Sequence, residues 1–509
     1  MARVAVIGAG MAGLAVSARL AKRKHDVTVL EASSTIGGKL GRYSRDGFVF
    51  DTGPSLLTIP AVYRDTFRKS GRPLESELDL LPVDPAFHYR FADGSEVRLP
   101  NASRAGTKRA LDDAFGNDAG AAWFALLERA GQIWDVTRGP FLESPLEGPR
   151  TLARLARNVD HVRVVAPWQT LRGMGKHYLR DARLRQMLDR YATYSGSDPR
   201  KAPGVLSTIP YVEQTFGAWH VPGGLRNLGE ALARRVEFRG ATVRTNAEVT
   251  QVLVQDGRAV GVRLADGETV GADVVIANCD ASTLYGRLLQ GDRAGERAAS
   301  SVMRSISKAG LSFSGFVLLL AVRGRTPGME HHTVLFPADY DDEFDSVFGT
   351  ARRDARPAPD PAVYICNPDD PQMRPDGHES WFVLVNAPRQ RDIAGPDDQP
   401  GTIDWAAPGV ADAYADHVLA VMAKRGLDVR DRLLWRVVRT PDDLQRETGA
   451  PGGAIYGTSS NSQRAAFLRP ANQSPIPGLY LVGGSSHPGG GLPLVGLSAE
   501  IVSDLVGDA

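Results

Sequence analysis

The chain has 509 residues, in which 60 lysines and arginines balance 59 aspartates and glutamates, for a formal charge of +1. This balance excludes a globally basic nucleic-acid-binding protein. The two cysteines, Cys279 and Cys366, lack metal-ligand spacing, so we expect no disulfide framework and no metal site. We predict a globular protein of two or three domains, with an apolar strand from Val4 and no leader segment before it.

The first elements predicted along the chain form a βαβ unit. A strand in residues 3–7 runs into a glycine-rich turn and an alanine-rich helix, and a second strand ends at Glu31. This is the context in which glycines bind a dinucleotide: one forms the tight turn, one admits the pyrophosphate, and one lets the helix pack on the strand. A carboxylate at the end of the second strand binds ribose hydroxyls. The predicted contacts are Gly8, Gly10, Met11, Ala12, Gly13 and Glu31.

The next stretch, ASSTIGGKLGRYSRDGFVFDTGPSLL, resembles the extended FAD motif of the flavin amine oxidase and carotenoid desaturase superfamily. The resemblance implies that this segment follows the pyrophosphate toward the flavin, with Lys39 and Arg42 near phosphate oxygens. An arginine fork suits that role, although a surface salt bridge is the alternative for Arg42. The implied contacts are Gly38, Lys39, Arg42, Gly53, Pro54 and Ser55.

The middle of the chain carries helical and hairpin patterns. Residues 104–200 are mostly helical in pattern, and residues 241–278 hold alternating strands separated by the turn signals QDGR and ADGE. In the superfamily this second region belongs to the FAD domain, with the backbone at Val249 near the adenine. Residues 151–190 hold nine Lys/Arg against three Asp, interleaved with apolar residues. This pattern is typical either of a membrane-surface helix or of an ordinary solvated helix face.

The C-terminal stretch GLYLVGGSSHPGGGLPLVGLSAEIVSDLV resembles the C-terminal signature of bacterial phytoene desaturases. It predicts a last strand, a turn at Gly483–Gly484 and a closing helix from Leu497 to Val506. The resemblance implies that the glycine-rich part wraps the ribityl chain and the flavin ring. Ser485 stands where many related flavoproteins carry an aspartate for the ribityl chain. The implied contacts are Gly483, Gly484, Ser485, Gly491, Leu492, Pro493 and Val495.

The motifs together predict an α/β protein. A Rossmann-like FAD-binding domain would be assembled from residues 1–75, 220–290 and 450–509. An inserted α+β substrate domain would comprise residues 76–219 and 291–449, with a helical, membrane-facing part near 151–190. We therefore expect a cytoplasmic protein that associates peripherally with the membrane.

The resemblance implies an FAD-dependent oxidoreductase that desaturates a carotenoid: phytoene, a hydroxycarotenoid or a C30 carotene. The flavin would accept a hydride from the apolar polyene, and the cation left behind is stabilised by adjacent double bonds, so no strong protein base is required. His487 is the candidate catalytic residue, because histidine titrates near neutral pH. A hydrogen bond that only holds the loop is its alternative role, and the carboxylate of Glu143 is a second, weaker acid/base candidate.

Two other functions stay open at this point. A carotenoid cis–trans isomerase resembles the desaturases but uses reduced FAD without net redox change. A non-catalytic lipid-binding member of the superfamily, like the GDP-dissociation inhibitors, is disfavoured by the complete FAD motifs at both ends. A flavin amine oxidase is disfavoured because the aromatic-rich C-terminal pattern of its substrate cage is missing.

Overall fold

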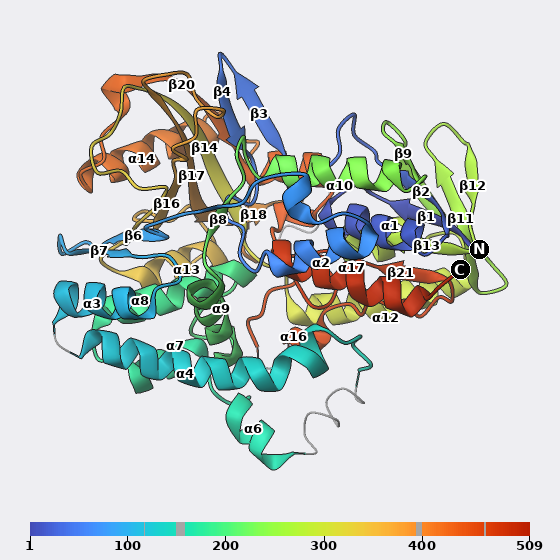
Figure 1. The fold of residues 1–509 in the computed structure, drawn as a ribbon, viewed down its shortest axis with the longest axis horizontal. Coiled ribbons are helices and arrows are strands. Elements are labelled where there is room, and N and C mark those ends of the chain that lie inside the picture. Colours follow the sequence, from blue (N-terminus) through green and yellow to red (C-terminus); the bar gives the residue numbers. More distant parts are fainter. Residues whose placement is uncertain (117, 149–157, 393–399, 463–464) are drawn as a thin grey trace.

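A parallel sheet of five strands is built from residues that lie far apart in the sequence. The structure is a computed structural model that describes residues 1–116, 118–148, 158–392, 400–462 and 465–509. Figure 1 shows this sheet near both chain termini. In spatial order its strands are β21 (Leu479–Leu481), β13 (Val274–Ala277), β1 (Arg3–Ile7), β2 (Asp26–Leu30) and β9 (Thr242–Arg244).

Both faces of the parallel sheet are covered, which explains why its strands are almost entirely apolar. In β1, Val4 and Val6 join the core under one layer of helices, and Ala5 and Ile7 join the core on the opposite face. The first layer holds α1 (Met11–Lys22), α2 (Ala61–Ser70), α10 (Arg226–Phe238) and α17 (Leu492–Val506). The other face carries α11 (Ala281–Thr283), α12 (Arg293–Ala309) and the antiparallel strands β10 (Val249–Gln255), β11 (Arg258–Leu264) and β12 (Thr269–Gly271).

A seven-stranded mixed sheet forms the second half of the molecule. Its second strand in spatial order, β14, is buried over nine of its ten residues, because α14 covers one face and the hairpin of β3 and β4 the other. In order, the strands are β20 (Leu433–Arg439), β14 (Ser314–Arg323), β17 (His378–Ala387), β16 (Val363–Cys366), β15 (His332–Leu335), β6 (Phe87–Arg90) and β7 (Glu96–Leu99). The hairpin strands are β3 (Arg42–Arg45) and β4 (Phe48–Asp51), and α14 spans Val410–Lys424.

A layer of helices packs beneath the seven-stranded sheet, as the pattern of residues 104–200 predicts for the described part (Figure 1). It comprises α3 (Arg104–Phe115), α4 (Ala119–Thr137), α6 (Val159–Val165), α7 (Leu171–Tyr178), α8 (Ala182–Arg190), α9 (Thr208–Phe216) and α13 (Tyr340–Phe348). In the described part of the chain, the remaining α-helices are α15 (Pro441–Thr448) and α16 (Ala465–Leu468), and the short strands are β5 (Leu81–Pro82), β8 (Trp219–His220), β18 (Arg389–Gln390) and β19 (Thr402–Ile403). Among the described residues, no helix combines the length and apolarity needed to cross a bilayer.

The α/β class with discontinuous segments is confirmed. The parallel sheet draws strands from each of the three segments predicted for the FAD domain. Two elements pack across the predicted boundaries, however. Helix α12 lies in the segment 291–449 but packs on the parallel-sheet side, and the β3–β4 hairpin lies in the segment 1–75 but covers the seven-stranded sheet. The boundaries themselves stay a prediction.

Candidate cofactor and substrate site

The turn after β1 leaves no room for side chains. A Cβ atom on Gly13 would lie 2.2 Å from the carbonyl oxygen of Gly8, and one on Gly10 would lie 2.8 Å from Oδ1 of Asn278. Gly8 itself has φ +96°, in the region that favours glycine. Bare backbone therefore meets the start of α1, whose first N–H groups have no intrahelical partner.

Asn278 joins the two glycine-rich ends of the chain. Its Oδ1 accepts a hydrogen bond from the Gly13 N–H at 2.9 Å, and its Nδ2 donates to the Val482 carbonyl at 3.2 Å. It directly follows β13, which neighbours β1 in the parallel sheet. The sequence analysis missed this residue, although a polar residue at the carboxyl end of a parallel strand is the available signal.

Glu31 and Val249 lie at the end of the predicted adenosine pocket. The Glu31 carboxylate accepts from the Ala9 N–H at 2.7 Å and from the Ser33 N–H at 3.0 Å, which fixes it beside the glycine turn. The Ala247 N–H donates to the Glu31 carbonyl at 2.8 Å, so β10 and its first residue, Val249, start next to Glu31. Each carboxylate oxygen keeps a second lone pair for a ribose hydroxyl.

The segment after β2 folds back against the glycine turn. The Gly37 N–H donates to the Ala9 carbonyl at 2.8 Å, which places Gly38 beside the turn. Lys39 donates through Nζ to the Ala454 and Ile455 carbonyls at 3.0 and 2.7 Å. Burial lowers the pKa of Lys39, and Asp280 opposes that shift. A partly buried ammonium that donates to two neutral carbonyls suits an anionic ligand.

The motif DTGPS contains both anchoring and site-facing residues. Asp51 accepts from the Leu225 and Arg226 N–H groups at 2.7 and 3.1 Å, so it anchors the start of α10. A Cβ on Gly53 would lie 1.8 Å from the Lys39 carbonyl oxygen, which explains the glycine. Gly53, Pro54 and Ser55 themselves stay partly exposed.

Arg42 has protein partners on α10 and in the turn just before it. Its guanidinium bonds the Asn227 side chain at 2.6 Å and the Gly223 carbonyl at 3.2 Å, and it pairs with Glu230 at 3.3 Å. The salt bridge that was the alternative for this residue is therefore present. Its contact with a phosphate stays a prediction.

The C-terminal glycine-rich segment lies over the same region. One prediction for this segment, the start of its helix, is wrong. Helix α17 begins at Leu492, five residues before the predicted start at Leu497, because Pro493 stands in its first turn, where proline is well tolerated. Leu492, Pro493 and Val495 thus lie on the helix, and Gly491 is its exposed N-cap.

Ser485 already has one partner in the protein. Its Oγ accepts from the Ala281 N–H at 2.9 Å, so its hydroxyl hydrogen and one lone pair are left for a ribityl contact. The neighbouring pair Gly483–Gly484 forms the turn after β21. A Cβ on Gly483 would lie 2.7 Å from Nδ2 of Asn278.

Arg469 holds the glycine-rich segment in place through hydrogen bonds. The sequence analysis did not identify this arginine. It is buried and donates to three carbonyls, those of Tyr456 at 2.9 Å, Thr458 at 2.8 Å and Gly484 at 2.6 Å. Burial lowers its pKa to about 10. The arginine therefore fixes the loop at 456–458 against the glycine-rich turn.

A chain of polar side chains leads from Ser55 into the seven-stranded sheet. Ser55 Oγ lies 2.7 Å from the Tyr364 hydroxyl, which lies 2.8 Å from Nδ1 of His332. The metal-capable atoms of His331, His332 and Cys366 lie within 4.8 Å of one another beside this chain. The sequence analysis found no such cluster, because its members are brought together only by the pairing of β15 with β16.

His487 links the glycine-rich segment to residues 141–144. Its Nε2 lies 2.8 Å from the Phe141 carbonyl and 3.1 Å from the Ser144 carbonyl, so Nε2 carries the proton that both accept. Burial lowers the pKa of His487 to about 4, partly opposed by these two hydrogen bonds. The catalytic role stays a prediction. Glu143 is bonded to Arg138 at 2.6 Å, on the surface.

We expect His487→Gln to separate the two roles, because glutamine keeps an N–H near the position of Nε2 but does not titrate. The unfolded histidine takes up a proton near pH 6.5 and the folded one only near pH 4, so His487 stabilises the fold above pH 6.5 and loses that contribution as the pH falls. Between pH 7 and pH 4, this histidine should lower the free energy of unfolding of the wild-type protein by about 3 kcal/mol. The variant lacks that loss, so its Tm should fall less steeply over the same range. A fall in turnover of about 10²-fold or more would assign the proton-acceptor role; a smaller fall would assign the holding role.

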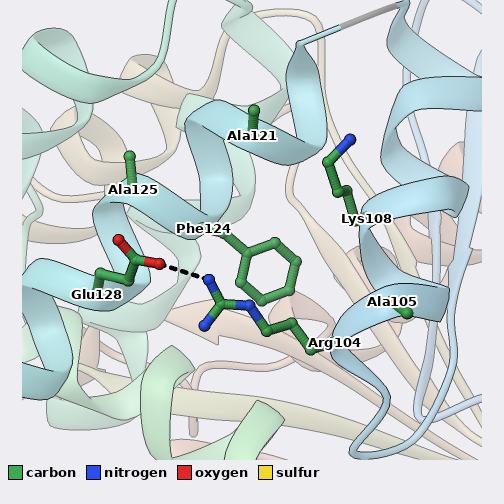
Figure 2. Close-up of a pocket in the computed structure, with 7 residues that line it drawn as sticks. All are labelled: Arg104, Ala105, Lys108, Ala121, Phe124, Ala125 and Glu128. Atoms are coloured by element: carbon green, nitrogen blue, oxygen red, sulfur yellow. Dashed lines mark hydrogen bonds and ion pairs between the residues drawn. The ribbon is translucent and has the colours of Figure 1, made fainter.

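One hollow on the surface lies away from the predicted site. It has a volume of about 480 Å³ between α3 and α4, and Arg104 lies over the Phe124 ring and pairs with Glu128 (Figure 2). No residue of the predicted site lines it. Its lining residues are Arg104, Ala105, Lys108, Ala121, Phe124, Ala125 and Glu128.

The chemistry of the glycine site fits FAD. Gly8, Gly10 and Gly13 present bare backbone at a helix N-terminus, Glu31 presents a fixed carboxylate, and Lys39 presents a partly buried cation. These are the groups that bind a pyrophosphate and a ribose. The model for flavin containing amine oxidoreductases matches residues 11–399.

The chain belongs to that family.

Within the family, the chain is similar to carotenoid enzymes over nearly its whole length. It is 33% identical to a hydroxyneurosporene desaturase from Rubrivivax gelatinosus, covering 99% of this chain and 92% of that protein. It is 30% identical to a 4,4'-diapolycopene oxygenase from Methylomonas sp (99% and 98% covered) and 30% to a 1-hydroxycarotenoid 3,4-desaturase from Flavobacterium sp. (99% and 99%). These relatives confirm the predicted family, and the match to the flavin-containing family confirms the FAD cofactor and the oxidoreductase class.

Solved structures share the fold at low identity. An oxidoreductase from Methanosarcina mazei matches with a TM-score of 0.64 at 15% identity, covering 99% of this chain and 100% of that one. A triple mutant of putrescine oxidase matches with a TM-score of 0.63 at 14% identity (100% and 99% covered). Fold class and family therefore agree.

Proposed function

We propose that the protein is an FAD-dependent carotenoid desaturase that takes a hydride from the polyene. The observation that carries the proposal is the clasp at Asn278, which bonds Gly13 and Val482 and so brings both glycine-rich FAD motifs to one site. End-to-end similarity to carotenoid desaturases supports it. The FAD-binding part would comprise the parallel sheet with α12, and the substrate-binding part the seven-stranded sheet with the helical layer.

Each part of the chain would have a distinct task in this reaction. FAD supplies the hydride acceptor when it is bound. The residues predicted for the pyrophosphate and ribose (Gly8, Gly10, Gly13, Glu31, Gly38 and Lys39) would hold the cofactor, and the segment 483–495 would approach its flavin end. The apolar helical layer would exclude water and orient the polyene against it.

The experiment is anaerobic mixing of the FAD-loaded protein with vesicles that carry single carotenes. We expect the absorbance of the oxidised flavin to bleach with one carotene, and chromatography to recover a product with more conjugated double bonds. An isomerised pigment that forms only after chemical reduction of the flavin would contradict desaturation and support the cis–trans isomerase. Bound lipid with no bleaching and no isomer would support the non-catalytic alternative.

We also propose that the edge around α6 contacts the membrane. Figure 1 shows α6 at the outer edge of the helical layer. Val159 and Trp168 are 61% and 62% exposed there, next to the exposed cation Arg163. Exposed apolar side chains beside cations favour an anionic bilayer surface. Residues 151–157 of the basic segment lie outside the described residues.

Replacing both Val159 and Trp168 by serine should weaken binding to phosphatidylglycerol vesicles about tenfold, because each buries apolar surface in the interface. Co-sedimentation over a lipid series measures this. Phe238→Ser is the matched control, since Phe238 is 66% exposed on α10 at the other side of the molecule (Figure 1). Equal binding by all three proteins would contradict the proposal.

A further inference from the structure

Arg190, the last residue of α8, is a buried cation with no ion pair among the described residues. Only 7% of the residue is exposed, and no described group accepts a hydrogen bond from its Nη1. The carboxyl group of Glu213 acts on Arg190 through its charge, but its two oxygens accept from the Tyr191 and Tyr194 hydroxyls at 2.5 and 3.2 Å. A buried guanidinium nitrogen without an acceptor is costly, so the N–H groups of Nη1 call for a partner.

Aromatic rings surround this guanidinium. Its carbon lies 4.9 Å from the centre of the Phe87 ring, 5.1 Å from Tyr194, 5.6 Å from Tyr364 and 5.8 Å from Tyr89. The faces of these rings stabilise the charge but accept no N–H bond of ordinary strength. The hydroxyl of Tyr89 is also fully buried and without a partner among the described residues. Two unsatisfied polar groups therefore share one apolar environment.

This cluster lies one side chain away from the predicted flavin site. Tyr364, one of the rings around Arg190, bonds Ser55 at 2.7 Å. On another side lies Tyr456, close enough for the charge of Arg190 to act on its hydroxyl. A Cβ on Gly490 would lie 2.5 Å from the Tyr456 ring. Both connections lead to residues of the predicted FAD motifs.

We propose that Arg190 and Tyr89 bind a hydroxyl group carried by the polyene close to the bond that is oxidised. This inference rests on the proposed function and narrows its substrate to an oxygen-bearing polyene. A hydroxyl can accept from the guanidinium and donate to the Tyr89 oxygen, which a hydrocarbon cannot do. A carboxylate is disfavoured, because Glu213 already places a carboxyl group beside the guanidinium.

The short path from Arg190 to Ser55 limits where the hydroxyl can lie along the polyene. With one ring between the two sites, only a few carbon–carbon bonds can separate the oxygen from the reacting carbons. The printed name of the 30% identical Flavobacterium relative gives such a spacing for that enzyme, with its hydroxyl on C1 and its new double bond at C3–C4. The remainder of the polyene would lie against apolar surface.

The test compares a 1-hydroxy acyclic polyene with the matching hydrocarbon. Quenching of tryptophan fluorescence reports binding without turnover, and anaerobic flavin bleaching reports the reaction. We expect the wild-type protein to prefer the hydroxylated polyene by about 10- to 100-fold. Arg190→Met should remove that preference, and Arg190→Lys should keep part of it. Arg183→Met is the matched control, because Arg183 lies on the same helix over the Phe115 ring and pairs with Asp181 at the surface.

Each outcome decides a separate point. Equal binding of the two polyenes by the wild-type protein would overturn the hydroxyl site and leave the desaturase function intact. A preference that Arg190→Met abolishes, without any bleaching, would keep the site and overturn the desaturase function. If Arg190→Met does not fold, Tyr89→Phe carries the test, since it removes one hydroxyl: the preference should fall severalfold, and an unchanged preference would contradict the proposal.

Discussion

Gly13→Ala should strip the purified protein of FAD. The new Cβ would lie 2.2 Å from the Gly8 carbonyl and 2.7 Å from Oδ1 of Asn278, so α1 must move away from β1 or the clasp to Val482 must open. Overpacking against fixed backbone costs about 3 kcal/mol, and the same movement displaces the N–H groups that face the pyrophosphate. We expect FAD affinity to fall about 100-fold, measured by the flavin absorbance retained after gel filtration, with a lower Tm by circular dichroism.

Gly229→Ala is the control for this variant. Gly229 lies inside α10 of the same layer, and a Cβ there would meet Met11 Sδ at 3.4 Å and Leu40 Cδ2 at 3.5 Å, which are ordinary contacts. Alanine is the better helix former by about 1 kcal/mol, so FAD content should stay unchanged and Tm should stay or rise. A Gly13→Ala protein that keeps its FAD like this control would show that the turn does not hold the cofactor.

Arg469→Met should destabilise the opposite wall of the site. It removes the three bonds to the Tyr456, Thr458 and Gly484 carbonyls and leaves those carbonyls buried without donors. Hydrogen bonds from charged donors contribute about 1.5–3 kcal/mol each to the free energy of unfolding. Because the loop can partly relax, we expect the variant to lose about 4 kcal/mol of that free energy. Flavin fluorescence, which rises as FAD is released, and thermal unfolding measure the effect.

Arg469→Lys tests whether charge or fork geometry matters. One ammonium cannot reach three carbonyls in the way that the planar guanidinium does, so we expect a Tm between the wild type and Arg469→Met. If the lysine variant equals the wild type, the charge near Asp280 is what the site requires. If the methionine variant retains the wild-type Tm and FAD content, the support by Arg469 is refuted.

The sequence predicted those parts of the fold that depend on local pattern. The βαβ unit around Gly8–Gly13 and the hairpins at 249–271 follow from glycine placement and from alternating apolar residues. Helix α17 was predicted five residues too short, because the glycines and prolines before Leu497 read as loop. In the structure, Pro493 occupies the one helical turn where its missing N–H costs nothing.

The site residues that sequence reasoning missed depend on long-range pairing. Asn278, Arg469 and Arg190 carry no motif of their own, and each gains its role from a neighbour more than ten residues away in the chain. His332 and Cys366 meet only because they are opposed in the pairing of β15 with β16. A buried charge reveals itself only once its surroundings are known, which a single sequence does not give.

The strand order of the parallel sheet also sets the timing of assembly. Its edge strand, β21, begins at Leu479, although β1 begins at Arg3. During synthesis, therefore, the parallel sheet stays one strand short until the residues of β21 have left the ribosome. Non-local pairing of this kind slows folding and leaves an apolar edge open meanwhile. The parallel sheet is therefore complete only once β21 has paired with β13, and we expect FAD capture to follow that pairing.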